Sequence, residues 1–186
     1  MGSTWPLPRQ IPIAPDLRLR PLTPQDAADV LAYASDPEFA RHIHAGCTSL
    51  EQAAEFISKI TREIDAGTRF YWAVEYAGRV RGTIGYLNLH LLPETLEVGY
   101  GIARDLWGRG VINACMHVLI PLGFAQFGAR RMIVATHRAN VRSIGFARKF
   151  GFVPDHEVGD TVTLSLERAE YEARAPKLPG APRKDL

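Results

Sequence analysis

Residues 95–113 read TLEVGYGIARDLWGRGVIN, and this stretch decides the fold. It predicts a strand over 95–102, a tight turn at Trp107-Gly108-Arg109-Gly110, and a largely apolar, buried helix from Val111 to Phe127. A glycine turn between a strand and a helix lets several backbone N–H groups approach one anion, and the helix dipole adds positive potential there. The stretch therefore predicts a phosphate or pyrophosphate site, although many such turns are only loops that need a positive φ.

Upstream of this stretch, capping residues predict two helices. Thr23 before Pro24 predicts the start of a helix that ends before Pro37. A second helix is expected from Ser49, where Gln52 completes a capping box, with an apolar stripe that ends at Gly67. Strands are expected at 17–20, as the first regular element, and at 70–76 and 80–89, as an antiparallel pair.

Downstream, the pattern continues with a strand at 132–136, a helix at 140–150 closed by Gly151, and two strands on either side of a turn at 158–160. Helices and strands alternate, so the fold class is α/β. A single domain is expected over 17–172, after an extended proline-bearing segment at 1–16 and before a tail at 173–186.

Composition excludes several classes of partner. The 186 residues include 22 lysines and arginines and 20 acidic residues, a balance that indicates neither a nucleic acid nor an anionic membrane as partner. No apolar run approaches membrane-spanning length, and prolines interrupt the N-terminus where a signal peptide would need an apolar core. With only Cys47 and Cys115, no disulfide framework is expected, so the sequence predicts a soluble cytoplasmic protein.

Four ordered segments resemble the GNAT superfamily of acetyltransferases, in particular its RimJ/RimL-like branch of ribosomal-protein N-terminal acetyltransferases. The similarity runs from about Leu17 to Glu172. It is carried by Glu97-Val98-Gly99-Tyr100, Trp107-Gly108-Arg109-Gly110, Asn140-Val141-Arg142-Ser143 and Lys149-Phe150-Gly151-Phe152.

The resemblance implies a mixed, centrally splayed sheet of about six to seven strands flanked by helices. It also implies that acetyl-CoA is the co-substrate, with its pyrophosphate on backbone amides of the glycine turn and its pantetheine added like a strand to residues 100–102. The cofactor-binding residues implied are Tyr100, Gly101, Ile102, Trp107, Gly108, Arg109, Gly110, Val111, Ile112, Asn113, Asn140 and Ser143.

Acetyl transfer to an amine needs a base for the ammonium and a proton donor for the leaving thiolate. The resemblance makes Ser143 the donor and Glu97 the leading base, acting directly or through water. Two alternatives stay open, because Asn140 and Ser143 are also good helix caps and Glu97 could instead pair with an arginine. Further base candidates are His90 and His137, whereas His42 and His44 lack the additional ligands of a metal site, so no metal is expected.

The sequence thus predicts transfer of an acetyl group to a primary amine, either the α-amine of a protein or a small molecule, with a homodimer possible. A non-catalytic CoA-sensing or protein-interaction module is the alternative. It is motivated by Ile112, where the family commonly has a small residue, and by Ala114-Cys115, which replaces a frequent Glu-Ala. ATP binding is disfavoured, because the turn lacks the lysine and the spacing of a P-loop.

Overall fold

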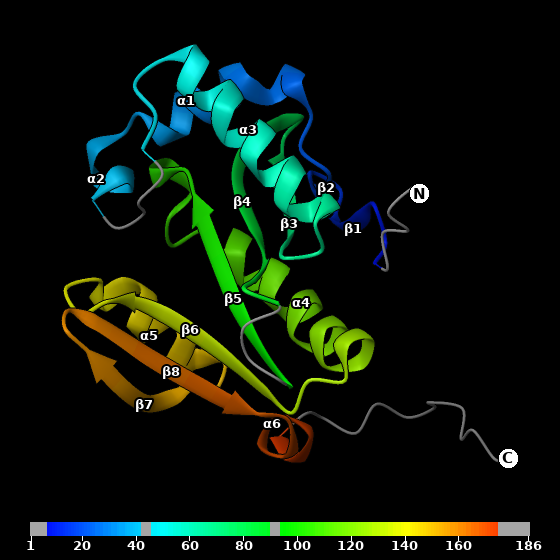
Figure 1. The fold of residues 1–186 in the computed structure, drawn as a ribbon, viewed down its shortest axis with the longest axis vertical. Coiled ribbons are helices and arrows are strands. Elements are labelled where there is room, and N and C mark those ends of the chain that lie inside the picture. The colour runs from blue at the N-terminus through cyan, green and yellow to red at the C-terminus, as the bar shows by residue number, and fades with distance from the viewer. Residues whose placement is uncertain (1–6, 42–45, 90–93, 175–186) are drawn as a thin grey trace, which may run out of the picture.

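The computed structural model describes residues 7–41, 46–89 and 94–174. An open sheet of eight strands, in the order β1-β2-β3-β4-β5-β6-β8-β7, runs through it (Figure 1). The strands are β1 (Ile11–Ala14), β2 (Leu17–Arg20), β3 (Phe70–Tyr76), β4 (Arg79–Leu87), β5 (Thr95–Ile102), β6 (Arg131–His137), β7 (Val153–Val158) and β8 (Thr161–Glu167). Neighbouring strands are antiparallel except β5 and β6, so the sheet is mixed, as predicted.

Helices cover both faces of the sheet. They are α1 (Ala27–Ala34), α2 (Pro37–Ala40), α3 (Leu50–Asp65), α4 (Val111–Phe127), α5 (Val141–Lys149) and α6 (Arg168–Arg174), with 3₁₀ turns η1 (Pro24–Asp26) and η2 (Arg104–Leu106). One hydrophobic core joins α1, α2 and α3 to Ala73, Val80 and Ala103. A second, larger core joins α4 to the opposite face, through side chains such as Trp72 and Val98. The sheet is therefore the middle layer of three.

The centre of the sheet opens where β5 and β6 separate. The two strands are paired only at their beginnings, from Thr95 opposite Arg131 to Glu97 opposite Ile133. β5 continues to Ile102 along β4, while β6 continues to His137 along β8. The two strands consequently diverge as a V that is open at their carboxyl ends (Figure 1). The splayed sheet implied by the resemblance is confirmed.

Most predicted elements are confirmed, and the differences have local causes. The first strand is β1, earlier than predicted, because Ile11 and its neighbours pair with β2 despite the surrounding prolines. The short helix α2 was not predicted; Pro37 stands at its first turn, and the Asp36 side chain accepts from the amides of Glu38 and Phe39. Helix α6 was not predicted either; it lies at the boundary between the expected domain and the expected tail.

A buried ionic cluster connects the 3₁₀ turn η1 to strands β2 and β3 of the sheet. The Arg20 guanidinium, from β2, donates to both carboxylate oxygens of Asp26 at 2.8 Å and, through Nε, to Glu75 Oε2 of β3 at 2.5 Å. Burial, the largest single influence, raises the pKa of Asp26 and of Glu75. Hydrogen bonds and charge from Arg20, together with Thr23 at Asp26 and Arg18 at Glu75, outweigh it in sum, so both pKa values are lowered. The cluster thus stabilises the fold only while both carboxyl groups are ionised.

None of the helices formed by the described residues is both long and apolar enough to cross a membrane.

Candidate active site

A cavity of about 710 Å³ lies where β5 and β6 diverge. Its walls come from β5, β6, the turn before α4, the first turn of α4 and one side of α5, and it reaches α2 on the other face of the sheet. The lining includes Glu38, Phe39, Tyr71, Leu87, Val98, Gly99, Leu106, Val134, Ala135, Thr136, Ala139, Val141, Arg142, Phe146 and Lys149. It also includes Glu97, Tyr100, Gly101, Ile102, Trp107, Gly108, Gly110, Val111, Ile112, Asn113, Asn140 and Ser143. The cavity therefore opens the sheet from one face to the other.

The glycine turn has the backbone geometry of an anion cradle. Gly108 and Gly110 both have positive φ, 75° and 79°, and a Cβ built on either would meet no atom within 4 Å. The first amide paired inside α4 is that of Ala114, which donates to Gly110 O at 2.9 Å. The amides of residues 111–113 precede this bond and point out of the helix N-terminus, where the helix dipole is positive. Because the glycines have no side chains, an anion can reach these amides.

Cationic side chains of α5 lie beside this cradle. The Arg142 guanidinium carbon stands 4.1 Å from the centroid of the Trp107 ring, and Trp107 Nε1 donates to Ile102 O at 2.9 Å. Trp107 thus connects the turn to the end of β5, and its ring packs against the Arg142 guanidinium. Lys149, at the other end of α5, also lines the cavity. Arg142 and the amides of α4 make the end of the cavity at the turn electropositive, and Lys149 adds positive charge on the α5 side.

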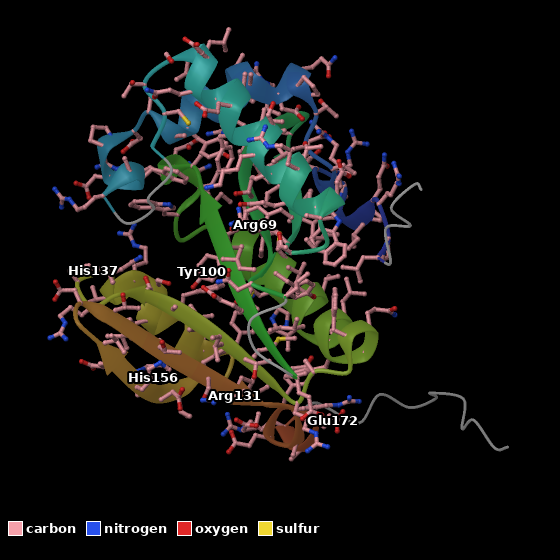
Figure 2. All side chains as sticks on the ribbon, in the orientation of Figure 1. Arg69, Tyr100, Arg131, His137, His156 and Glu172 are labelled. Carbon is pink, nitrogen blue, oxygen red and sulfur yellow. The ribbon has the colours of Figure 1, made fainter. Side chains whose placement is uncertain are left out.

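A chain of hydrogen bonds connects β6, α5 and β5. Asn140 Nδ2 donates to Thr136 Oγ1 at 3.2 Å, and Asn140 Oδ1 accepts from the Ser143 amide at 3.1 Å. The hydroxyl oxygens of Ser143 and Tyr100 are 2.9 Å apart and share a hydrogen bond. The Tyr100 ring meets the Phe146 ring edge-on. Ser143 is thereby held at the opening between β5 and β6, and Figure 2 shows Tyr100 on the β5 side of this opening.

Glu97 lies on the opposite face of β5 from Tyr100. Side chains alternate along a strand, so Glu97 and Gly99 share the face that Tyr71 and the α1–α3 layer occupy. A Cβ on Gly99 would stand 2.8 Å from the Tyr71 hydroxyl, which confirms that this face is closely packed. Glu97 itself is half-buried, and its Oε2 accepts from Asn88 Nδ2 at 2.6 Å. In the described part of the chain Glu97 has no arginine partner, so the ion-pair alternative is not supported there.

Charge is segregated across the cavity. The carboxylates Glu97 and Glu38 lie on the side of the α1–α3 layer, whereas Arg142 and Lys149 lie on α5. Glu38 is held by Arg41 at 3.1 Å, and Arg41 itself is largely exposed. Such an arrangement favours an anionic ligand at the α5 side and a cationic one at the other side.

Glu97 and all the predicted cofactor-binding residues except Arg109, Ser143 included, line this cavity. The capping alternative holds for Asn140, which caps α5, but not for Ser143, whose hydroxyl contacts Tyr100. Ile112 lines the cavity, and its side chain is largely buried in the core around α4. Burial raises the pKa of the Cys115 thiol to about 12, which agrees with a packing role.

His137, the one histidine base candidate within the described residues, does not line the cavity. His137 Nδ1 accepts from the Ala139 amide, and its ring lies 4.0 Å from Asp160 at the exposed end of β6 (Figure 2). His42, His44 and His90 lie outside the described residues. Within the described ranges, no group of three or more histidine, cysteine or acidic side chains is placed to hold a metal ion.

Several lining residues were missed by sequence reasoning. Arg142, Phe146 and Lys149 recur at helical spacing, and Phe146 lies one turn after Ser143, so the periodicity of α5 would have placed them on one side. The side chain of Tyr100 was missed because only its backbone was considered. Glu38 had no local signal, since α2 reaches the cavity only through the packing of Phe39 against α1.

Comparisons with known proteins agree with this geometry. Residues 16–153 match the model of the acetyltransferase (GNAT) domain family. The chain is 28% identical over 168 residues to the uncharacterized N-acetyltransferase p20 of Bacillus licheniformis, covering 83% of this chain and 94% of that protein. It is also 28% identical over 85 residues to the putative ribosomal N-acetyltransferase YdaF of Bacillus subtilis, covering 46% of each chain.

Solved structures share the fold at low sequence identity. The microcin self-immunity acetyltransferase MccE, in complex with acetyl-CoA and AMP, has a TM-score of 0.77 at 15% identity, covering 87% of this chain and 97% of that one. RimL, a ribosomal-protein α-N-acetyltransferase in complex with coenzyme A, has a TM-score of 0.76 at 13% identity, covering 87% of this chain and 99% of that one.

Proposed function

The chain belongs to the acetyltransferase (GNAT) family, and we propose that it transfers the acetyl group of acetyl-CoA to a primary amine. The observation that carries this proposal is the cavity through the centre of the sheet, with an anion cradle on one side and a carboxylate on the other. Donor and acceptor can therefore approach from opposite faces and meet where β5 leaves β6.

The residues present fit coenzyme A. The open space over Gly108 and Gly110, the amides of residues 111–113, and the cations Arg142 and Lys149 would hold its phosphates. Backbone groups of β5 from Tyr100 to Ile102 would receive pantetheine as an added strand, since β6 no longer pairs there. Ile102 O already accepts from Trp107, so its second lone pair would serve. Acetyl-CoA supplies an activated acetyl group, and the chain supplies its position.

Glu97 is the proposed base. Its carboxylate faces the acceptor side, accepts one hydrogen bond from Asn88 and keeps further lone pairs for an ammonium or a bridging water. Ser143, on the other side of the opening, is the proposed donor to the departing thiolate. The base and the donor are thus held by different elements, β5 and α5, on either side of the reacting centre.

The proposed acceptor is a cationic primary amine, with the α-amine of a protein favoured over a small metabolite. Glu38 and Glu97 make the acceptor side acidic, which suits a protonated amine before it reacts. The names of YdaF and RimL assign ribosomal proteins to those relatives, and this supports a protein acceptor here. A cytoplasmic location and a homodimer are part of the same proposal.

Steady-state transfer assays test the proposal. Purified protein would be incubated with acetyl-CoA and peptides that have a free α-amine, and product would be measured as released CoA thiol and as the mass of the acetylated peptide. Matched peptides with a blocked α-amine and a free lysine, together with small amines, identify the acceptor class. Binding of acetyl-CoA with neither transfer nor slow hydrolysis would contradict the enzymatic proposal and favour a non-catalytic module.

A further inference from the structure

The side chain of Tyr100 reaches the same hydroxyl that the proposed reaction uses. Its Oη lies 2.9 Å from Ser143 Oγ, and either oxygen can be the donor by geometry alone. Its ring is held edge-on by Phe146 of α5, with ring centroids 5.2 Å apart. Because Ser143 follows the cap of α5 and its amide is bound by Asn140, only its hydroxyl hydrogen is free to choose a direction.

The two possible directions have different consequences. If Ser143 donated to Tyr100, its hydrogen would be occupied and unavailable to a thiolate. If Tyr100 donates, Ser143 accepts, and its own hydrogen is free to point into the cavity. A phenol is a stronger acid than an aliphatic alcohol and is therefore the better hydrogen-bond donor of the pair. The second direction is the favoured one.

We propose that Tyr100 is a positioning residue, which donates to Ser143 Oγ and so directs the Ser143 hydroxyl hydrogen at the thiolate that leaves acetyl-CoA. This proposal rests on the proposed function, in which Ser143 faces the departing sulfur. Tyr100 acts only through Ser143 and contacts neither the acetyl group nor the amine by its hydroxyl.

The balance of the reaction shows why Tyr100 positions and does not supply the proton. A bond forms between the amine nitrogen and the acetyl carbon, the bond from that carbon to sulfur breaks, and the amine gives up a proton to Glu97 or water. The departing thiolate is stabilised by the hydrogen bond from Ser143 Oγ and takes its proton from solvent, so the Ser143 hydroxyl never has to ionise. Burial raises the pKa of Tyr100 to about 12, with the Ser143 hydrogen bond opposing, and an aliphatic alcohol is a weaker acid than a phenol. Both hydroxyls therefore stay protonated and act through hydrogen bonds.

A double-mutant cycle separates this role from simple packing. The variants are Tyr100→Phe, Ser143→Ala and the pair, with Tyr171→Phe as the matched control; Tyr171 packs on Phe124 from α6, away from the cavity. Phenylalanine keeps the ring against Phe146 and the backbone of β5. We expect Tyr100→Phe to lower kcat about 3- to 10-fold, as for loss of one hydrogen bond, and to leave the KM for acetyl-CoA within about twofold.

The decisive measurement is the effect of Tyr100→Phe in the Ser143→Ala background. If Tyr100 acts through Ser143, its replacement lowers kcat no further there, whereas two independent or merely structural effects would multiply. Multiplication of the two effects, or an unchanged kcat in Tyr100→Phe alone, would overturn the proposal. Tyr171→Phe is expected to match the wild type in kcat.

The same experiment distinguishes this proposal from the proposed function. Thermal unfolding with and without acetyl-CoA is measured for each variant, and assays are run well below every melting temperature. A wild-type protein that binds acetyl-CoA but transfers nothing would refute the proposed function. If the wild-type protein transfers acetyl groups but the effects of the two substitutions on kcat multiply, only the role of Tyr100 is refuted.

Discussion

Gly110 and Gly128 lie at the two ends of α4. Comparing alanine variants at these two positions separates the effect of losing the anion cradle from the effect of backbone strain. Both are in the left-handed region, with φ of 79° and 62°, and a Cβ on either would meet no atom within 4 Å. Gly110 lines the cavity; Gly128 is not among the residues that line it. Replacing each by alanine therefore imposes the same kind of strain, while only Gly110→Ala puts a methyl group into the proposed phosphate space.

The expected sizes follow from this comparison. An alanine forced into the left-handed region costs about 1 to 2 kcal/mol, which lowers the melting temperature of a domain of this length by about 2 to 8 °C for either variant. In the wild type, acetyl-CoA at about 100 times its Kd adds about 2.7 kcal/mol, or about 5 to 10 °C. Losing one charge-assisted hydrogen bond in the cradle costs about 1.5 to 3 kcal/mol, so Kd should rise about 10- to 100-fold in Gly110→Ala.

Thermal unfolding across a titration of acetyl-CoA measures both effects. We expect similar melting temperatures for the two variants without ligand, a normal ligand shift in Gly128→Ala and a much smaller one in Gly110→Ala. A full ligand shift in Gly110→Ala, accompanied by the same loss of stability as in Gly128→Ala, would refute the assignment of the phosphates to this turn. ATP serves as the control ligand in each titration.

Three further predictions address the acceptor side and the fold. Glu97→Gln keeps an oxygen that accepts from Asn88 but removes the proposed base. We therefore expect kcat/KM to fall about 100-fold or more, with acetyl-CoA binding unchanged. A fall of less than tenfold would show that another group is the base. Glu38→Lys should raise the KM for a cationic acceptor about fivefold, whereas Glu51→Lys, exposed on α3, should not; equal effects would argue against recognition by Glu38. Asp26 and Glu75 have lowered pKa values in the folded state, so their contribution to stability is complete above about pH 5. It is lost as the pH falls through the pKa values of the unfolded state and below. Urea unfolding from pH 7 to pH 3 measures this, and a free energy of unfolding that does not change with pH would contradict it.

The fold was predictable because its signals are local. Ser49 caps α3 by accepting from the Gln52 amide at 3.2 Å, Gly128 ends α4 in the left-handed region, and Ala77-Gly78 turns β3 into β4. Each of these features depends on residues close in sequence. Helix α2 was missed for the opposite reason, since four residues carry too little periodicity and its stability comes from the Asp36 cap and buried Phe39.

The site was predictable only in part, because the local sequence does not show which residues far apart along the chain come into contact, nor how the helices pack over the sheet. The motif residues of β5, the turn and α5 were assigned through their order along the chain, and the structure brings them to one cavity, with Arg109 outside it. The contact between Tyr100 and Ser143 joins residues 43 positions apart and depends on the angle between β5 and β6. The acidic character of the acceptor side depends likewise on how α2 packs over the sheet.

The divergence of β5 from β6 explains why one strand can serve both substrates. Successive side chains of a strand point to opposite faces, so β5 presents Glu97 to the α1–α3 layer and Tyr100 to α5. In a continuous sheet these two faces would be separated by the backbone and by the next strand. Since β6 pairs with β5 only as far as Glu97, the two faces communicate from that residue onward. In the proposed reaction, an amine held on the acidic face would reach a thioester held on the basic face, and the separation of charge across the cavity would favour each substrate on its own side.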